Sequence, residues 1–345
     1  MMTRPLLLNA TLAVTLAAVP AAAAAAGKLN IFNWGEYTSM EMIEKFEKEY
    51  DVSVTIDSYD SNETMLAKIK AGASGYDIAV PGDYMVAIMI EEDMLERVEP
   101  SQMSNYENLD DRWKNVYWDP GNHYSIPWNW GTTTFVVNTN VYKGDIHTLA
   151  LLFDPPPELQ GRINLLRDVN DVINAALRYL DLPRCNSNPE DLRKLMDLLM
   201  EVKPHIKSFA YESKELINSG EVDIAQIWNG FSLRARRERA EMHYAYPREG
   251  FTGWMDNLVV LKGAENLENA KLFMNFMMDP ENAAMQSNFT AYANGVKGSE
   301  QYINAEILES PEYQPPQWAP EPEFVPPCGP DVVTMYDRIW TNFLK

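Results

Sequence analysis

Positive charge is scarce in this 345-residue sequence, in which 29 lysine and arginine residues stand against 50 aspartate and glutamate residues. The formal net charge is −21. Proteins that bind nucleic acid or an anionic membrane rely on patches of lysine and arginine. The composition therefore argues against nucleic acid as a partner and is compatible with a cationic ligand. Acidity that serves only solubility explains most of the charge equally well.

Common catalytic and cofactor-binding motifs are also missing. The sequence contains no G-x-S-x-G motif, no G-x-G-x-x-G motif and no P-loop, and its four histidines lack the spacing of metal ligands. We therefore expect no catalysis, no cofactor and no metal. The alternative is an exported carbohydrate-active enzyme, with Asp168 or Asp256 as acid and base and the tryptophans as sugar platforms.

Only two cysteines, Cys185 and Cys328, are present. They lie far apart in the sequence and match no metal-binding or redox motif. In an exported protein they could form one disulfide. Two separate buried thiols are the other possibility, and the spacing does not decide between them.

The N-terminal segment is the one stretch that resembles a targeting signal. Arg4 is followed by a largely apolar run at residues 6–19, then by Pro20 and an alanine tract that offers several A-x-A cleavage sites. Residues 1–26 are therefore expected to be a cleaved secretory signal peptide. An uncleaved membrane anchor is the alternative, because the apolar run is nearly long enough to span a bilayer.

The rest of the chain alternates strand and helix patterns, which predicts an α/β fold with parallel strands. The two α/β halves predict a ligand cleft between two lobes. The proline-rich stretch at residues 311–330 is expected to be extended or looped. Strands are expected at residues 28–33, 52–58, 76–81, 132–138, 162–166, 222–228 and 258–261, and helices at 39–50, 63–71, 84–97, 169–180, 189–202, 232–241, 266–278 and 331–344.

Acidic residues recur with aromatic residues at or near expected strand ends: residues 33–37 (NWGEY), 83–84 (DY), 168–171 and 254–256 (WMD), with Trp228 ending a strand. Such carboxylates are costly to desolvate unless positive charge lies beside them. A carboxylate stabilises an ammonium group by about 1.5–3 kcal/mol per hydrogen bond. Aromatic rings add about 0.5–2 kcal/mol per cation-π contact and offer flat walls to a methylene chain. The pattern predicts a cage for a linear polyamine.

Several of these residues have a purely structural explanation as well. Asp168 and Asp171 suit the N-cap and the third position of the helix that is expected to follow. Trp254 and Asp256 suit a core tryptophan and a turn before the next strand. For the two aspartates, capping and ligand binding stay open and are compatible with each other.

Six segments of the chain together form a recognisable pattern: residues 33–37 (NWGEY), 61–70 (SNETMLAKIK), 76–84 (YDIAVPGDY), 124–131 (YSIPWNWG), 227–230 (IWNG) and 254–256 (WMD). In this order they resemble the spermidine/putrescine-binding proteins of ABC transporters. The resemblance covers nearly the whole mature chain. It implies a type II periplasmic-binding-protein fold, in which two α/β lobes joined by crossover strands close on a polyamine and deliver it to a membrane permease. We accordingly expect a monomeric periplasmic protein.

The resemblance also implies lobe boundaries and a binding site. Lobe 1 would contain residues 27–132 and 257–300, and lobe 2 would contain residues 133–256 and 301–345. The aspartates would bind ammonium groups while the aromatic rings sandwich the methylenes. The predicted site residues are Trp34, Glu36, Tyr37, Tyr84, Asp168, Asp171, Trp228, Trp254, Asp256 and Tyr292.

Departures from the family pattern leave the preferred ligand open. Gly82 stands where the family often has a small hydroxyl residue, Asp171 stands where a longer glutamate is common, and Arg167 puts a cation beside the expected site. A glutamine that some relatives supply near the C-terminus has no clear match, and Gln317 is only one candidate. Putrescine, spermidine, spermine, agmatine and a quaternary amine all remain possible ligands.

Overall fold

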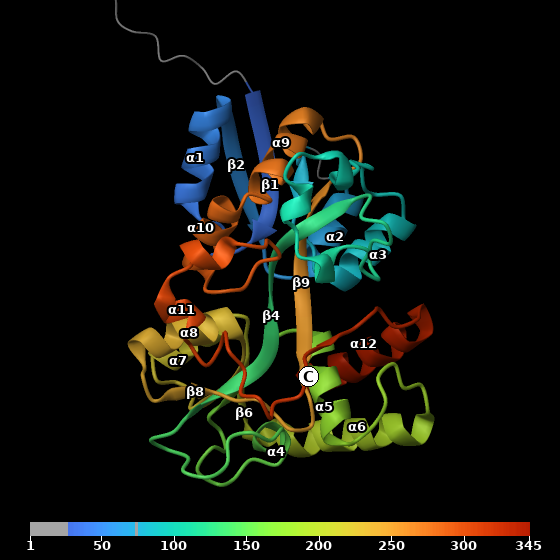
Figure 1. Ribbon diagram of the computed structural model, residues 1–345. Coiled ribbons are helices and arrows are strands. Elements are labelled where there is room, and N and C mark those ends of the chain that lie inside the picture. The colour runs from blue at the N-terminus through green and yellow to red at the C-terminus, as the bar shows by residue number, and fades with distance from the viewer. Residues whose placement is uncertain (1–26, 73–74) are drawn as a thin grey trace, which may run out of the picture.

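The computed structural model describes residues 27–72 and 75–345, so the expected signal peptide, residues 1–26, lies outside the described residues. Two lobes lie one above the other in Figure 1, and two long strands run from one to the other. We call the upper lobe, which holds the N-terminal strands, lobe 1 and the lower lobe lobe 2. Within the described residues, no helix is long and apolar enough to cross a membrane.

All ten strands of the described residues belong to one connected sheet. Its main path has the order β2-β1-β3-β9-β4-β7-β5-β6, while β10 pairs with β9 and β8 pairs with β4. The strands are β1 (Gly27–Trp34), β2 (Val52–Tyr59), β3 (Ile78–Ala79), β4 (Ser125–Asn138), β5 (Ile163–Leu165), β6 (Ile206–Phe209), β7 (Ile224–Trp228), β8 (Met242–Tyr244), β9 (Thr252–Val260) and β10 (Glu323–Phe324).

The pairing pattern explains how the lobes are joined. Strand β1 is parallel to β2 and β3 in lobe 1, and β5 is parallel to β6 and β7 in lobe 2. Between these parallel groups, β4 and β9 are antiparallel to each other and pass through both lobes (Figure 1). They are the crossover strands, and the expected two-lobed α/β fold is confirmed.

Helices cover the sheet in both lobes. They are α1 (Met40–Tyr50), α2 (Asn62–Lys70), α3 (Asp83–Glu91), α4 (Ala150–Phe153), α5 (Val169–Tyr179), α6 (Pro189–Val202), α7 (Ser213–Asn218), α8 (Asn229–Glu238), α9 (Leu267–Met277), α10 (Pro280–Thr290), α11 (Ala305–Leu308) and α12 (Pro330–Leu344). Helix α1 illustrates how the sequence forms them. The Ser39 hydroxyl caps it by accepting a hydrogen bond from the Met42 amide, and Met42, Ile43 and Phe46 bury one face of it at helical spacing.

Residues near the predicted boundary at positions 300 and 301 contact both lobes. Ile303 and Ile307 lie in one apolar cluster with Leu233 of α8 and Ala284 of α10. Farther on, α12 packs its buried face into the core of lobe 2 against α5 and α6. The lobe boundaries therefore remain a prediction, although the last helix does lie on lobe 2.

Several elements differ from the expectations. Strand β9 begins at Thr252 instead of residue 258, because it pairs with β4 along its length, and β4 begins at Ser125 instead of residue 132. Helix α3 ends at residue 91, well before residue 97. Pro280 begins a further helix, α10, for which Asp279 is the N-cap. Sequence analysis did not predict that helix, nor strand β6 and helix α7.

Cys185 and Cys328 form a disulfide, which decides the question that their spacing left open. The bond closes a stretch of 143 residues and attaches the segment before α12 to the loop between α5 and α6. Cross-links across long loops stabilise folded chains by about 2–4 kcal/mol. The C-terminal segment is thus fixed to lobe 2 covalently.

Candidate ligand-binding site

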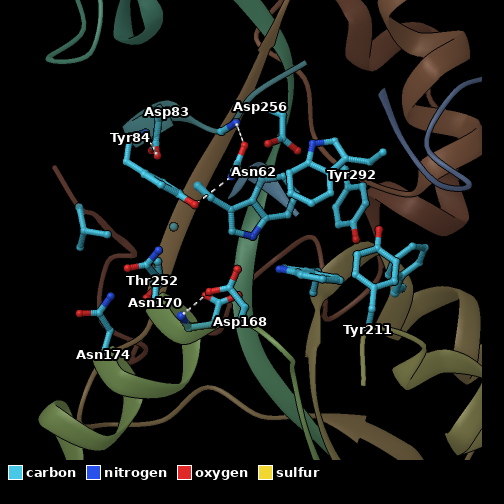
Figure 2. A pocket seen from close by; sticks show the side chains of 18 of the residues that line it. Asn62, Asp83, Tyr84, Asp168, Asn170, Asn174, Tyr211, Thr252, Asp256 and Tyr292 are labelled. Atoms are coloured by element: carbon cyan, nitrogen blue, oxygen red, sulfur yellow. Dashed lines mark hydrogen bonds between the residues drawn. The ribbon is translucent and has the colours of Figure 1, made fainter. Parts of the chain in front are cut away.

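A cavity of about 750 Å³, part of it open to solvent, lies between the lobes beside the crossover strands (Figure 2). Nine of the ten predicted site residues line it. They are Trp34, Tyr37, Tyr84, Asp168, Asp171, Trp228, Trp254, Asp256 and Tyr292.

The topology of the sheet brings these residues together. Trp34 ends β1, Tyr84 follows β3, Asp168 follows β5 and Trp228 ends β7. These four strands belong to the two parallel groups, whose carboxyl ends face the space between the lobes. Ligands of α/β sheets bind at this edge. Segments that are up to about two hundred residues apart in the sequence therefore meet at one place.

Strand β9 supplies the central wall. Side chains alternate between the two faces of a strand, so Trp254 and Asp256 point to the cavity while Met255 between them is fully buried in the core. Trp254 can lie close to β4 because Gly131 opposes it, and a Cβ atom at position 131 would come within 2.7 Å of the indole. The interpretation of residues 254–256 as a turn is therefore wrong.

Asp168 and Asp171 combine both roles that the sequence allowed. The Asp168 carboxylate accepts a hydrogen bond from the Asp171 amide at 2.9 Å and so caps α5. Both side chains also line the cavity. Capping therefore fixes the position of a carboxylate that a ligand can reach.

Four carboxyl groups face the cavity in total, since Asp83 joins Asp168, Asp171 and Asp256. Among the described residues, no lysine, arginine or histidine lines the same cavity. Burial raises the pKa of Asp83 to about 7, and burial together with the neighbouring Asp171 charge raises the pKa of Asp168 to about 7. Burial also raises the pKa of Asp171 to about 6 and that of Asp256 well above its usual value. A cation would favour the charged form of all four groups.

Aromatic rings form much of the remaining wall. The ring centroids of Trp254 and Tyr292 are 5.1 Å apart, and those of Tyr211 and Trp228 are 5.0 Å apart. The Trp34 indole is oriented by its Nε1, which donates a hydrogen bond to the Val80 carbonyl at 2.9 Å. These rings offer flat apolar surface between the carboxyl groups, which Figure 2 shows with Asp83 and Asp256 toward one end and Asp168 toward the other.

Sequence reasoning missed several lining residues. Asp83 was noted beside Tyr84 in the motif at residues 76–84, but it was not assigned to the site. Asn62 accepts a hydrogen bond from the Gly82 amide and donates one to the Tyr84 hydroxyl, both at 3.1 Å. Tyr211 follows the unpredicted strand β6. The other lining residues that were missed are Asn170, Asn174, Phe231, Thr252, Gly253 and Val325.

The C-terminal segment completes the wall through Val325. The Tyr117 hydroxyl of lobe 1 donates a hydrogen bond to the Val325 carbonyl at 3.0 Å. Next to it, β10 pairs with β9 and the disulfide at Cys328 holds the segment to lobe 2. Gln317, the candidate for the family's C-terminal glutamine, is not among the lining residues.

Glu36 does not line the cavity, so the structure does not place it with the other nine predicted residues. Its carboxylate accepts hydrogen bonds from Lys214 Nζ at 2.8 Å and Arg234 Nη2 at 3.0 Å. The hydrogen bond from Lys214 lowers the pKa of Glu36. Arg167 likewise lies outside the cavity, in a neighbouring cleft that shares Asp168.

The fold and the cavity define a class of protein. Two lobes joined by crossover strands enclose a site to which both contribute, as in type II solute-binding proteins. Within the described part of the chain, no group of three or more histidine, cysteine, aspartate or glutamate side chains is arranged to hold a metal ion.

Comparisons with known proteins agree with this class. Residues 41–316 match the family described as bacterial extracellular solute-binding protein. The spermidine/putrescine-binding periplasmic protein 1 of Haemophilus influenzae is 32% identical over 86% of this chain and 82% of its own. The putrescine-binding periplasmic protein SpuD of Pseudomonas aeruginosa is 31% identical over 88% of this chain and 89% of its own. A solved structure of a putative spermidine/putrescine ABC transporter protein from Listeria monocytogenes superposes with a TM-score of 0.85 at 31% identity, covering 92% of this chain and 98% of that one.

The chain therefore belongs to the bacterial extracellular solute-binding proteins. The resemblance to the spermidine/putrescine-binding proteins that the sequence motifs indicated is confirmed. The family and these relatives are solute-binding proteins, so the expectation that the chain is not an enzyme is confirmed as well.

Proposed function

We propose that the protein captures a linear polyamine of the spermidine/putrescine class in the inter-lobe cavity and delivers it to the permease of an ABC transporter. The observation that carries this proposal is the set of four carboxyl groups without a lysine, arginine or histidine among the described lining residues. A buried carboxylate that lacks a positive partner is destabilising. A polyamine supplies the missing charges, and its methylene chain suits the aromatic walls.

The strength of the interactions is sufficient for tight binding. Each charge-assisted hydrogen bond to a carboxylate contributes about 1.5–3 kcal/mol, and each cation-π contact about 0.5–2 kcal/mol. A few of each would offset the cost of ordering a flexible ligand and reach micromolar affinity, which corresponds to about 8 kcal/mol.

Ligand binding should close the lobes. Trp34 and Tyr84 belong to lobe 1, whereas Asp168 and Trp228 belong to lobe 2, and all four line the same cavity. A single ligand can therefore contact both lobes only when the crossover strands allow the two lobes to approach each other. Such hinge closure is a common response of binding proteins.

The setting of this activity is also part of the proposal. We propose that residues 1–26 direct export and are removed, that the mature protein works as a monomer in the periplasm, and that its only macromolecular partner is the permease. The names of the relatives, which describe them as periplasmic, support the location. Amino-terminal sequencing of the periplasmic protein and light scattering after gel filtration test the processing and the monomer.

A thermal-shift panel on refolded, ligand-free mature protein tests the ligand. The panel contains putrescine, spermidine, spermine, agmatine, choline and several sugars. A ligand present at about 100 times its dissociation constant stabilises the folded state by about 2.7 kcal/mol, which is easily measured. A clear rise of the midpoint with one or more linear polyamines supports the proposal. A rise with choline or a sugar while all linear amines have no effect would refute it.

A further inference from the structure

Three charged side chains converge where the cleft opens beside the cavity. Glu36 follows β1 of lobe 1, whereas Lys214 lies on α7 and Arg234 on α8 of lobe 2. Lys214 Nζ and Arg234 Nη2 both contact the same Glu36 oxygen, Oε2, at 2.8 and 3.0 Å. The two cationic side chains are largely buried, with 16% and 18% exposure, while the Glu36 side chain is 59% exposed.

Arg234 also contacts aromatic rings of both lobes. Its guanidinium carbon lies 5.1 Å from the ring centroid of Phe231 in lobe 2 and 5.7 Å from that of Phe289 on α10 of lobe 1. These rings hold the guanidinium in place when Glu36 approaches. The ion pair and the ring contact with Phe289 both join the lobes, so both depend on closure.

The cluster lies next to the ligand cavity. Glu36 and Lys214 line a neighbouring cleft together with Tyr211 and Phe231, and the last two residues line the cavity as well. Glu36 therefore lies beside the cavity without lining it, and two protein cations already pair with its carboxylate.

We infer that Lys214 and Arg234 withhold Glu36 from the ligand and use it to hold the lobes together, and that the site consequently selects dications over longer polyamines. This inference rests on the proposed function. Asp83 and Asp256 lie toward one end of the cavity and Asp168 toward the other (Figure 2), which matches a ligand with two terminal ammonium groups. An additional internal ammonium would lack the acceptor that Glu36 could provide.

Calorimetric titration of four proteins with putrescine and spermidine tests the inference. They are the wild type, Glu36→Gln, the double variant Lys214→Met/Arg234→Met, and the triple variant that combines all three changes. Wild type should bind putrescine more tightly than spermidine. Glu36→Gln should lower the affinity for both ligands by the same factor, about three- to tenfold, because an ion-pair contact of the closed state is lost.

The double variant separates the two consequences of the cluster. It should lower the affinity for putrescine about as much as Glu36→Gln does, because the same contact is lost. It should also raise the affinity for spermidine relative to putrescine by about fivefold or more, because Glu36 is released to accept the internal ammonium. The triple variant should bind putrescine as Glu36→Gln does and lose the relative gain for spermidine.

Arg239→Met is the matched control. Arg239 forms an ion pair with Glu241 at 2.7 Å that lies within lobe 2, and its side chain is 24% exposed. Its removal should leave both affinities unchanged. Thermal midpoints of the ligand-free variants check that each protein is folded.

Three results would overturn the inference. One is a Glu36→Gln variant whose affinity for spermidine falls much more than its affinity for putrescine, since Glu36 would then bind the ligand directly. The others are tighter wild-type binding of spermidine than putrescine, and a double variant with unchanged affinities. Failure of the proposed function is distinguishable, because in that case the wild type binds neither amine.

Discussion

Two regions of this protein bury a carboxyl group, and they differ in where its positive counter-charge comes from. Glu312, in the C-terminal segment, is 3% exposed and receives two hydrogen bonds of 2.8 Å from the Arg236 guanidinium. Asp256 is 8% exposed, and in the described cavity around it no cationic side chain is found. In the first region the chain supplies its own counter-charge and completes its core. In the second region the counter-charge must come from the ligand. The ligand-free protein is therefore less stable, and its affinity for a cationic ligand is higher.

Replacing Asp256 by asparagine should have the largest effect on binding. The charge partner of an ammonium group is lost from a buried site, so the affinity for every polyamine should fall by about 2 kcal/mol or more, which is about thirtyfold. The ligand-free protein should unfold at the same or a higher temperature, because an unpaired buried carboxyl group has been removed. Calorimetry and thermal unfolding measure the two effects. Unchanged affinity would remove Asp256 from the site.

Glu312→Gln should show the opposite pattern. It leaves the largely buried Arg236 without its carboxylate, so the free energy of unfolding should fall by about 2 kcal/mol, less than for a fully buried pair because Arg236 is 27% exposed. Polyamine affinity should change by less than about twofold, since Glu312 is not part of the cavity lining. Denaturant titration and calorimetry check this. A large loss of affinity with intact stability would contradict the distinction between the two regions.

Polyamine affinity should decrease as the pH falls from 8 to 5. The pKa values of Asp83 and Asp168 are about 7 and that of Asp171 is about 6. A bound cation favours the charged carboxylates, so binding must displace protons below these pKa values. The affinity should fall by up to about tenfold per pH unit for each proton displaced. Calorimetry in buffers of different ionisation enthalpy counts the protons, and a pH-independent affinity would exclude these aspartates.

The stability of the ligand-free protein should depend on pH in the opposite sense. The folded-state pKa values of these aspartates lie above the unfolded value of about 3.9, so the folded protein binds more protons than the unfolded chain between about pH 4 and 7. Their contribution to stability is therefore greatest at low pH and is lost as the pH rises through 7. Saturating ligand should remove most of this loss. Thermal midpoints at pH 5 and pH 8, with and without ligand, measure it.

Gly82→Ser should have the smallest effect. A Cβ atom at this position would lie 3.6 Å from Asp256 Oδ1 and 3.1 Å from Asn62 Nδ2, so a small side chain fits if Asn62 shifts slightly. The added hydroxyl can accept a hydrogen bond from an ammonium group, worth about 1 kcal/mol or about fivefold in affinity. Gly82→Ala is the control. An equal gain with alanine would show that the hydroxyl is not responsible.

Local sequence was enough to predict most of the residues that line the cavity, but not all of them. The carboxylate and aromatic residues at strand ends were found because strand ends are visible in the alternation of apolar and polar residues. Glu36 was expected among these residues, but it does not line the cavity and pairs instead with Lys214 and Arg234, which are 178 and 198 positions away in the sequence. Pairings over such distances leave no local pattern.

The same reason explains the differences in the fold. Strand β9 is extended through Trp254 and Asp256 by its pairing with β4, which the sequence of either strand alone does not reveal. Strand β6 spans only Ile206–Phe209, too short for a clear pattern. Pro280 was interpreted as the end of a helix, although proline is equally suited to the first turn of a new one.

The position of Val325 in the cavity wall has a consequence for how the protein is made. A chain emerges from the ribosome beginning at its N-terminus. The cavity uses residues from Trp34 to Val325, and the disulfide that holds its last wall needs Cys328. An unfinished chain therefore cannot hold a polyamine in the complete site, and synthesis itself sets the moment at which the protein first becomes able to retain its cargo.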